Sequence, residues 1–287
     1  NRWPYDVRAI YEDQEGNLWL GTSGGGLVQL RPQSVHVLRA GQGLPASPPT
    51  ALALDANGRI YVGLQRGGLF VGESGRFDRV AGGEQMALQS FISSICVAKD
   101  GTVWAGTLGD GLFGLRNGRM IQFTTANGLA DNFVPTVCAD SAGGVWAGTG
   151  AGTVNHFDGQ KMVRFDKSQG LPGSVVTAFI KASAGGYWLG TQDGHVLREQ
   201  NGKFTEIPLS PKREHHPVLA LMEGEPGRLW IGTDGGGLAG LIDGTELDWG
   251  VSNGLPNNVV AGVVADKAKN LWLATGTGIC RINRNDL

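Results

Sequence analysis

The chain has 287 residues, with 24 basic and 26 acidic side chains and a formal net charge of −2. This balance excludes the basic footprint that a nucleic-acid partner needs, and it excludes a polybasic contact with a membrane surface. No stretch reaches the roughly 18 apolar residues that span a bilayer. The 48 glycines favour many short strands joined by tight turns, because glycine takes the positive φ angles that such turns need.

One motif recurs along the whole chain: an aromatic residue, a small or apolar residue, and then Gly-Thr or a close variant. Its aromatic positions are 42 or 43 residues apart. The seven copies begin at Trp19, Tyr61, Trp104, Trp146, Trp188, Trp230 and Trp272. A repeat of this length with several short strands is typical of one blade of a β-propeller.

The third copy illustrates the strands expected in each blade, in chain order. Strands are predicted over 92–98, 103–107, 112–115 and 120–125. Between the last two, Asn117-Gly118 predicts a hairpin turn whose twist matches that of its strands. No useful stretch has helical periodicity. The sequence therefore predicts an all-β fold, a seven-bladed β-propeller with four-stranded blades of about 42 residues.

The inner strand of each copy alternates small and large side chains. Ten residues before the motif aromatic the residue is small: Ala9, Ala51, Ser94, Thr136, Ala178, Ala220 and Gly262. The next residue is large and apolar: Ile10, Leu52, Ile95, Val137, Phe179, Leu221 and Val263. Because adjacent strand residues point to opposite faces, each blade should pack a large face on the small face of a neighbour. The motif aromatics are interpreted as core residues of the same layers.

The repeat register also locates the two ends of the ring. The first inner strand is expected to begin near Val7, and 279–282 is expected to be the third strand of the last blade. The last blade therefore lacks its outer strand within this chain. Either the blade has three strands, or flanking sequence supplies the fourth. Since natural proteins usually cover an open sheet edge, we expect 1–287 to be a single propeller excised from a longer multidomain chain.

The consensus of the copies joins a Gly-Leu-Pro loop, an apolar strand, the pattern Asp-x-x-Gly-x-Leu-Trp-x-Gly-Thr, and a closing Gly-Gly-Leu. The segments 13–27 and 227–238 are its best copies, and the loop occurs at 43–45, 170–172 and 254–256. This consensus closely resembles the two-component regulator propeller repeat, and the resemblance covers essentially the whole chain.

The resemblance implies a role in bacterial signalling. Such propellers form the periplasmic, extracytoplasmic sensor part of inner-membrane receptors whose outputs are histidine kinases, hybrid two-component systems or diguanylate cyclases. Many carry two propellers and a small β-sandwich before the membrane span, whereas this chain has one propeller and neither sandwich, span nor output domain. Any link to a membrane would therefore lie in flanking segments. We expect a non-catalytic module that senses a ligand and passes the signal on.

The sequence contains no recognisable motif for catalysis or metal binding. Its five His lack the spacing of helical zinc sites and of zinc fingers. Its three Cys occupy apolar slots of the repeat, which favours buried thiols over a disulfide framework. No nucleophile elbow or phosphate-binding loop is present. We therefore expect no catalytic residue, no cofactor and no metal.

A binding site is expected where the copies differ on one exposed face. In a propeller, the loops that lead into the inner strands share a face with the turns between second and third strands. Fourteen residues before each aromatic the side chain is polar or Tyr: Tyr5, Ser47, Ser90, Asn132, Ser174, His216 and Asn258. The turns after Gly-Thr are mostly glycine, and the exceptions are Arg66, Asp110, Asp193, His195 and Asp234.

From these two sets we predict a ligand site at the mouth of the central channel, because concave sites with a few convergent polar groups are the usual binding sites. Its residues are Tyr5, Asn132, His216, Asn258, Arg66, Asp110, Asp193, His195 and Asp234. The alternative is that these side chains are polar only because water covers them.

Three functions remain open at this point. A sensor would bind a small polar ligand such as a saccharide or a short peptide, and it would signal through its docking on neighbouring domains or through a homodimer. A scaffold would dock a partner protein instead. A carbohydrate lyase or hydrolase would use His216 with Asp193 or Asp234 as acid and base.

Overall fold

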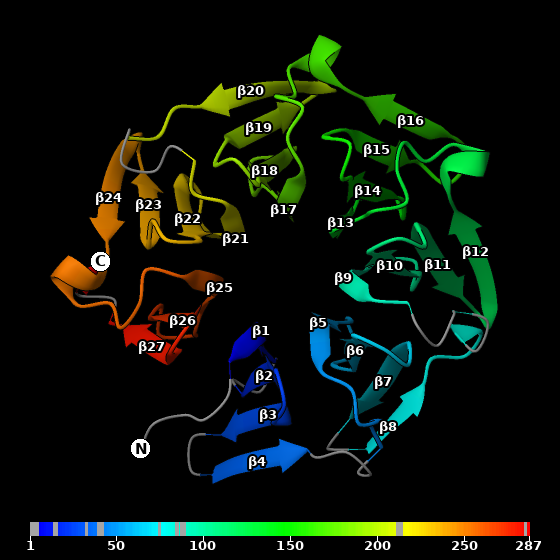
Figure 1. The fold of residues 1–287 in the computed structure, drawn as a ribbon, viewed down its shortest axis with the longest axis horizontal. Helices are drawn as coiled ribbons and strands as arrows, with labels where there is room; N and C mark the ends of the chain where they lie inside the picture. Colours follow the sequence, from blue (N-terminus) through cyan, green and yellow to red (C-terminus); the bar gives the residue numbers. More distant parts are fainter. Residues whose placement is uncertain are drawn as a thin grey trace.

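The computed structural model of the chain describes residues 6–13, 17–31, 34–38, 43–73, 76–83, 86, 90–210, 215–283 and 286–287. Figure 1 shows that these residues form seven antiparallel sheets around a central axis, with the chain running once around the ring. Six sheets have four strands and the last has three. The prediction of an all-β, seven-bladed propeller with a three-stranded last blade is confirmed.

Within each blade the strands follow one another in chain order from the axis outward (Figure 1). Blades 1 and 2 contain β1 (Val7–Glu12), β2 (Leu18–Thr22), β3 (Gly26–Arg31), β4 (Ser34–Leu38), β5 (Pro49–Leu54), β6 (Ile60–Leu64), β7 (Leu69–Glu73) and β8 (Arg76–Arg79). Blades 3 and 4 contain β9 (Ile92–Val97), β10 (Val103–Thr107), β11 (Leu112–Arg116), β12 (Arg119–Phe123), β13 (Thr136–Ala139), β14 (Val145–Gly148), β15 (Val154–Phe157) and β16 (Met162–Phe165).

The remaining blades repeat the pattern. Blades 5 and 6 contain β17 (Val176–Lys181), β18 (Tyr187–Thr191), β19 (Val196–Gln200), β20 (Lys203–Ile207), β21 (Val218–Glu225), β22 (Arg228–Thr233), β23 (Leu238–Ile242) and β24 (Thr245–Trp249). Blade 7 contains β25 (Val260–Ala265), β26 (Leu271–Thr275) and β27 (Gly278–Ile282). Short 3-10 turns lie between blades, at η2 (Thr125–Asn127), η3 (Lys167–Gln169) and η5 (Val251–Asn253). None of the helices in the described ranges has the length and apolar character of a membrane span.

Blade 3 shows how closely the repeat predicted the strands. The second strand has the predicted bounds, and Asn117 and Gly118 have φ angles of 50° and 72°, as the predicted hairpin turn requires. The outermost strand ends at Phe123 rather than at residue 125. The reason is that the Thr124 side chain accepts a hydrogen bond from the backbone N–H of Ala126 and begins η2.

Each inner strand contacts the inner strands of both neighbouring blades, and β1 closes the ring against β25 and β26. The predicted packing of large on small is visible at this closure. A Cβ added at Gly262 would lie 2.6 Å from Cγ2 of Ile10, so the large residue of blade 1 fills the place that glycine leaves in blade 7. Between blades 2 and 3, Ile92 and Ile95 lie against the motif glycine Gly63 of β6.

The propeller has two faces, which blade 4 defines. The loop 124–135 before its inner strand and the turn 149–153 between its second and third strands lie on what we call the loop face. The turns 140–144 and 158–161 lie at the other ends of the same strands, and we call that side the hairpin face. The residues predicted to bind a ligand belong to the loop face, apart from Tyr5, which lies outside the described residues.

Candidate functional site

A belt of backbone hydrogen bonds shapes the loop face in all seven blades. The residue after the Gly-Thr position donates its N–H to the carbonyl of the residue just before the inner strand, for example Leu108 to Phe91 at 3.1 Å and Asp234 to Pro217 at 2.8 Å. The motif Thr fixes the adjoining turn, since Thr107 Oγ1 donates to the carbonyl of Gly111 at 2.8 Å. This shared framework holds the non-repeated side chains of each blade in equivalent places.

The two predicted sets of site residues meet within single blades. In blade 3, Ser90 Oγ donates to Asp110 Oδ2 at 2.6 Å. In blade 5, the Ser174 side chain bonds the carboxylate of Asp193. In blade 2, the backbone N–H of Arg66 donates to Ser47 Oγ at 2.8 Å, which leaves the exposed Arg66 side chain over the loop face.

Blade 5 carries the most developed polar cluster of the loop face. His195 Nδ1 lies 2.7 Å from Glu206 Oε1, and His195 Nε2 lies 3.6 Å from Asp193 Oδ2. Thr191 Oγ1 donates to Asp193 Oδ1 at 2.9 Å. Burial raises the pKa of Asp193, but the hydrogen bonds from Ser174 and Thr191 and the nearby His195 outweigh this and hold it below its ordinary value. The cluster therefore offers a fixed imidazole and an anionic carboxylate to a polar ligand.

In blade 6 the predicted His216 and Asp234 are neighbours, but not through the Asp234 carboxylate. His216 Nδ1 donates to the backbone carbonyl of Asp234 at 3.0 Å. The imidazole lies against Gly235 and Gly236, where an added Cβ would come within 3.0 and 3.1 Å of ring atoms. The Asp234 side chain is exposed. Tyr5, the remaining predicted residue of the ring, lies outside the described residues.

Asn132 and Asn258 use their side chains within their own loops. Asn132 Oδ1 accepts the backbone N–H of Thr125 at 2.8 Å, and Asn258 Oδ1 accepts that of Val251 at 2.8 Å. Each acceptor thereby satisfies the first N–H of a 3-10 turn, η2 or η5, which has no partner within the turn. The amide nitrogens of these two side chains have no hydrogen bond among the described residues.

Replacing Asn132 with alanine should lower the free energy of unfolding by about 1 kcal/mol, because the N–H of Thr125 loses its acceptor. Urea denaturation measures the effect. The matched control is Asn57→Ala, because the exposed Asn57 side chain makes no bond in the described structure and its loss should cost about 0 kcal/mol. Equal losses in the two variants would show that the Asn132 side chain does not stabilise its loop.

An apolar pair on the loop face was not predicted. Leu108 and Phe133 form an isolated antiparallel bridge between blades 3 and 4, and their exposed fractions are 37% and 39%. The residue just before the inner strand is apolar in six of the seven copies: Pro48, Phe91, Phe133, Val175, Pro217 and Val259. This apolar position directly follows the polar position fourteen residues before the motif aromatic. The regular polar-then-apolar order is the signal in the sequence that could have revealed the apolar pair.

Inter-blade cavities lie toward the hairpin face, and they too were not predicted. In most blades a side chain on the third strand covers the motif aromatic. His156 stacks on Trp146 with ring centroids 4.1 Å apart, and Arg198 lies 4.8 Å from the centre of the Trp188 ring. In blades 3 and 6 the paired residue is a glycine, Gly114 opposite Trp104 and Gly240 opposite Trp230. Cavities of the described structure lie beside these two tryptophans.

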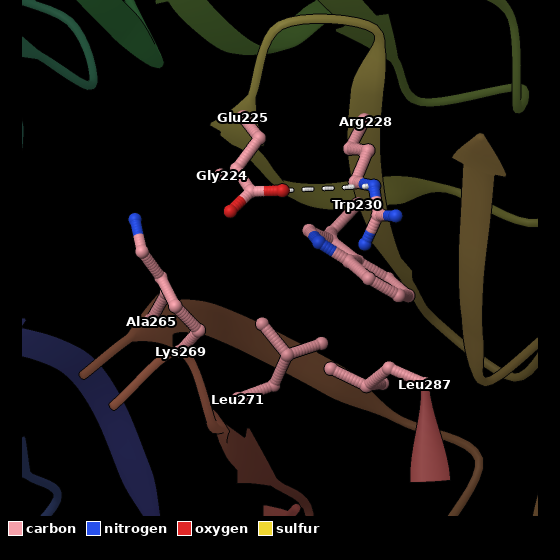
Figure 2. Close-up of a pocket in the computed structure, with 8 residues that line it drawn as sticks. All are labelled: Gly224, Glu225, Arg228, Trp230, Ala265, Lys269, Leu271 and Leu287. Carbon is pink, nitrogen blue, oxygen red and sulfur yellow. Dashed lines mark ion pairs between the residues drawn. The ribbon is translucent and has the colours of Figure 1, made fainter. Parts of the chain in front are cut away.

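The cavity between blades 6 and 7 is small, about 40 Å³. Figure 2 shows Trp230 on one side, with Leu271 and the C-terminal Leu287 facing its ring. Glu225 and Arg228 form an ion pair of 3.7 Å at the rim, opposite Lys269 (Figure 2). This volume holds a few water molecules at most, so the cavity cannot enclose an organic ligand.

The cavity between blades 3 and 4 is much larger, about 760 Å³. Its apolar wall contains Trp104, Ile121 and Phe157, and its rim carries Arg116 and Arg119. The volume lies within the range of pockets that bind small organic molecules. We call this cavity the 3/4 groove.

The side chains that commonly bind metals are not clustered in the part of the chain that the structure describes. Within those residues, no three His, Cys, Asp or Glu side chains are grouped so that they could hold a metal ion. The three cysteines are free thiols. Burial raises the pKa of Cys138 to about 12 and that of Cys96 well above its usual value, so neither thiol is a ready nucleophile at neutral pH.

Comparison with known proteins identifies the repeat. The family model described as "Two component regulator propeller" matches residues 3–24, 88–109 and 128–151. Each match contains the first two strands of a blade, with some or all of the loop before them: β1 and β2, β9 and β10, β13 and β14. No curated protein matches the chain in sequence.

Solved structures share the fold. The extracellular domain of a hybrid two component system from B. thetaiotaomicron has a TM-score of 0.81 and 22% identity, covering 98% of this chain and 39% of that one. A second such domain from the same organism has a TM-score of 0.79 and 20% identity, covering 96% of this chain and 38% of that one. Virginiamycin B lyase from Staphylococcus aureus has a TM-score of 0.79 and 12% identity, covering 96% of this chain and 94% of the lyase.

This chain thus spans less than two fifths of the receptor domains that share its fold. Its repeated loop and inner strands match the family model in several blades, and its fold is the propeller that those domains contain. The chain is a seven-bladed β-propeller, and segments in three of its blades match the two component regulator propeller repeat.

Proposed function

We propose that this propeller is the extracytoplasmic, ligand-binding sensor module of a bacterial signal-transduction receptor, and that it has no catalytic activity of its own. The family repeats and the fold shared with extracellular domains of hybrid two component systems support this role. In this proposal the module lies in the periplasm, and output and membrane attachment come from other parts of the receptor.

The observation that carries the proposal is the division of the loop face into constant and variable parts. The backbone belt repeats in all seven blades, and the motif Thr repeats in six, with Leu64 in its place in blade 2. The side chains mounted on this framework differ from blade to blade. Blade 5 presents His195 with Asp193, and blade 6 presents His216. Such a set of unlike polar groups on a rigid support suits a polar ligand such as a saccharide or a short peptide.

Signal transmission in this proposal does not require motion inside the ring. Every inner strand is packed between two others, and close-packed cores resist gradual deformation. A ligand on the loop face would instead alter how the propeller docks on neighbouring domains, or how two receptors associate.

The test is a thermal-shift screen of the chain against saccharides and short peptides, followed by variants of the loop face. A ligand at about 100 times its Kd stabilises the native state by about 2.7 kcal/mol, so the melting temperature should rise by several degrees. We expect His195→Ala and Phe133→Ala to reduce the shift strongly. Gln160→Ala is the control, because Gln160 is exposed on the hairpin face. A shift that survives both loop-face variants would contradict the proposed site.

The exposed pair Leu108 and Phe133 favours a second candidate, a scaffold that docks a partner protein. Neighbouring exposed apolar side chains are common in protein interfaces. The same screen separates the candidates, since a scaffold would respond to none of the small ligands. An enzyme would show turnover of a ligand that shifts the melting temperature, and that turnover would fall in His216→Ala.

A further inference from the structure

A glycine on the third strand leaves room for the 3/4 groove. Gly114 faces Trp104 across β10 and β11, and an added Cβ would lie 2.6 Å from Cζ3 of the indole. The tryptophan therefore lies over the glycine. The position occupied by His156 in blade 4 and by Arg198 in blade 5 carries no side chain here. The groove of about 760 Å³ lies beside Trp104.

The walls of the groove are aromatic. Trp104 meets Phe157 of blade 4 edge to face, with centroids 5.7 Å apart, and Phe157 contacts Phe123 at 4.8 Å. Ile121 adds an apolar side chain that is 44% exposed. A flat apolar group would gain contact with these side chains and would remove Ile121 from water.

The indole N–H of Trp104 has no hydrogen-bond partner among the described residues, because blade 3 lacks the aspartate that accepts this bond in blades 1 and 7. In blades 1 and 7 the motif indole donates to an aspartate six residues earlier, Trp19 to Asp13 at 2.8 Å and Trp272 to Asp266 at 3.0 Å. Blade 3 has Ala98 in that slot. Trp104 is only 2% exposed, and its Nε1 has no acceptor among the described residues. An unpaired buried donor of this kind is costly.

The rim of the groove carries two arginines, one of which has no ion pair among the described residues. Arg116 and Arg119 are directly opposite each other across β11 and β12, an arrangement that is unfavourable for like charges. Asp100 pairs with Arg116 at 2.7 Å. Burial raises the pKa of Asp100, but hydrogen bonds from Thr102 and the charge of Arg116 outweigh this and lower it. Arg119 has no hydrogen bond or ion pair within the described part of the chain.

Within the described residues, no ion pair joins Arg119 to the other acid beside the groove, Asp158. Asp158 precedes the lining residue Gly159, and its Oδ1 accepts the backbone N–H groups of Gln160 and Lys161 at 2.9 Å. Its carboxylate therefore serves its own hairpin turn. The groove combines an aromatic wall with one free guanidinium at the rim.

We propose that the 3/4 groove is a second binding site, on the side opposite the loop face, for an amphipathic organic carboxylate with a flat apolar body. The apolar body packs on Ile121 and on the partly exposed Phe157, which rests on Trp104. The carboxylate bonds Arg119 and Arg116, for which planar carboxylates are the preferred partners. This site is independent of the function proposed for the loop face.

Isothermal titration of the 287-residue chain with 2-naphthoate tests the proposal. We expect a Kd of about 1 mM or tighter. The uncharged 2-naphthamide should bind at least about tenfold more weakly, because it gives the guanidinium groups no anion. Acetate, which has no apolar body, should show no measurable binding at about 10 mM.

Variants then localise the binding. The double variant Arg116→Ala, Arg119→Ala should weaken 2-naphthoate binding at least about tenfold. The matched control is Lys203→Ala, since Lys203 is opposite Gln200 in blade 5 just as Arg119 is opposite Arg116 in blade 3. It removes one positive charge from the hairpin face and should leave Kd unchanged.

The titrations either support or contradict a site in the 3/4 groove. Binding that is lost in the arginine variant and kept in Lys203→Ala supports the groove. No binding to the unaltered chain at about 10 mM, or equal binding by the arginine variant, overturns the proposal. The exposed arginines contribute little to folding, so the melting temperature of the double variant should stay within a few degrees of the parent chain.

Discussion

Trp146→Ala is expected to lower the free energy of unfolding by about 3–5 kcal/mol, the range for removing a large buried aromatic. The Trp146 ring lies within 6.0 Å, centroid to centroid, of four other rings: His156, Tyr187, Phe165 and Phe179. They come from blades 4 and 5, so the indole joins two blades. Truncation would leave a cavity between sheets that cannot collapse, because each is held by its other neighbour.

Urea denaturation followed by circular dichroism measures this loss. The control is Trp249→Ala, since Trp249 lies on the outermost strand β24, is only partly buried and contacts one ring, that of Trp230 at 5.3 Å. Its loss should cost less than half as much. A loss below about 1 kcal/mol for Trp146→Ala would contradict the interpretation of the motif aromatics as core residues.

Gly232→Ala is expected to destabilise the chain by about 1–3 kcal/mol, the usual range for overpacking. A Cβ at Gly232 would lie 2.5 Å from the backbone oxygen of Val260 in the next blade. A backbone atom of an inner strand cannot move aside without shifting its whole sheet. The motif glycine is thus required by the close approach of the following blade.

The closing blade provides the matched comparison. Ala274 occupies the same slot of the motif in blade 7 and is fully buried. The reverse change, Ala274→Gly, should cost about 1 kcal/mol through the lost methyl group. Thermal and urea unfolding of both variants measure the difference. A neutral Gly232→Ala would mean that the blades can separate there without cost.

The fold could be predicted almost completely because the same sequence motif recurs in every blade. Seven copies of one motif fixed the number of blades, and turns such as Asn117-Gly118 fixed the hairpins. The end of β12 was misplaced by two residues because the competing hydrogen bond of Thr124 cannot be read from periodicity alone. The expectation that longer flanking sequence completes blade 7 stays a prediction.

The candidate site could be predicted only in part, since polar side chains can satisfy their own backbone as well as a ligand. The sequence placed both polar sets on the loop face and suggested His216 beside Asp193 or Asp234, of which the structure has Asp234, through its backbone carbonyl. It did not pair Ser90 with Asp110, which are hydrogen-bonded. It could not reveal that the carbonyl oxygen of the Asn132 side chain is used within its loop. The 3/4 groove was missed because Gly114 resembles the many turn glycines until the strand register places it opposite a tryptophan.

Amide hydrogen exchange of the chain, with and without the strongest ligand of the screen, tests the central claim most directly. We predict slower exchange at the loop face, in the loops before the inner strands and in turns such as 191–195 and 233–237, and little change at the turns of the hairpin face. Protection confined to the hairpin face or to the outermost strands would contradict the assignment of the loop face as the sensing surface.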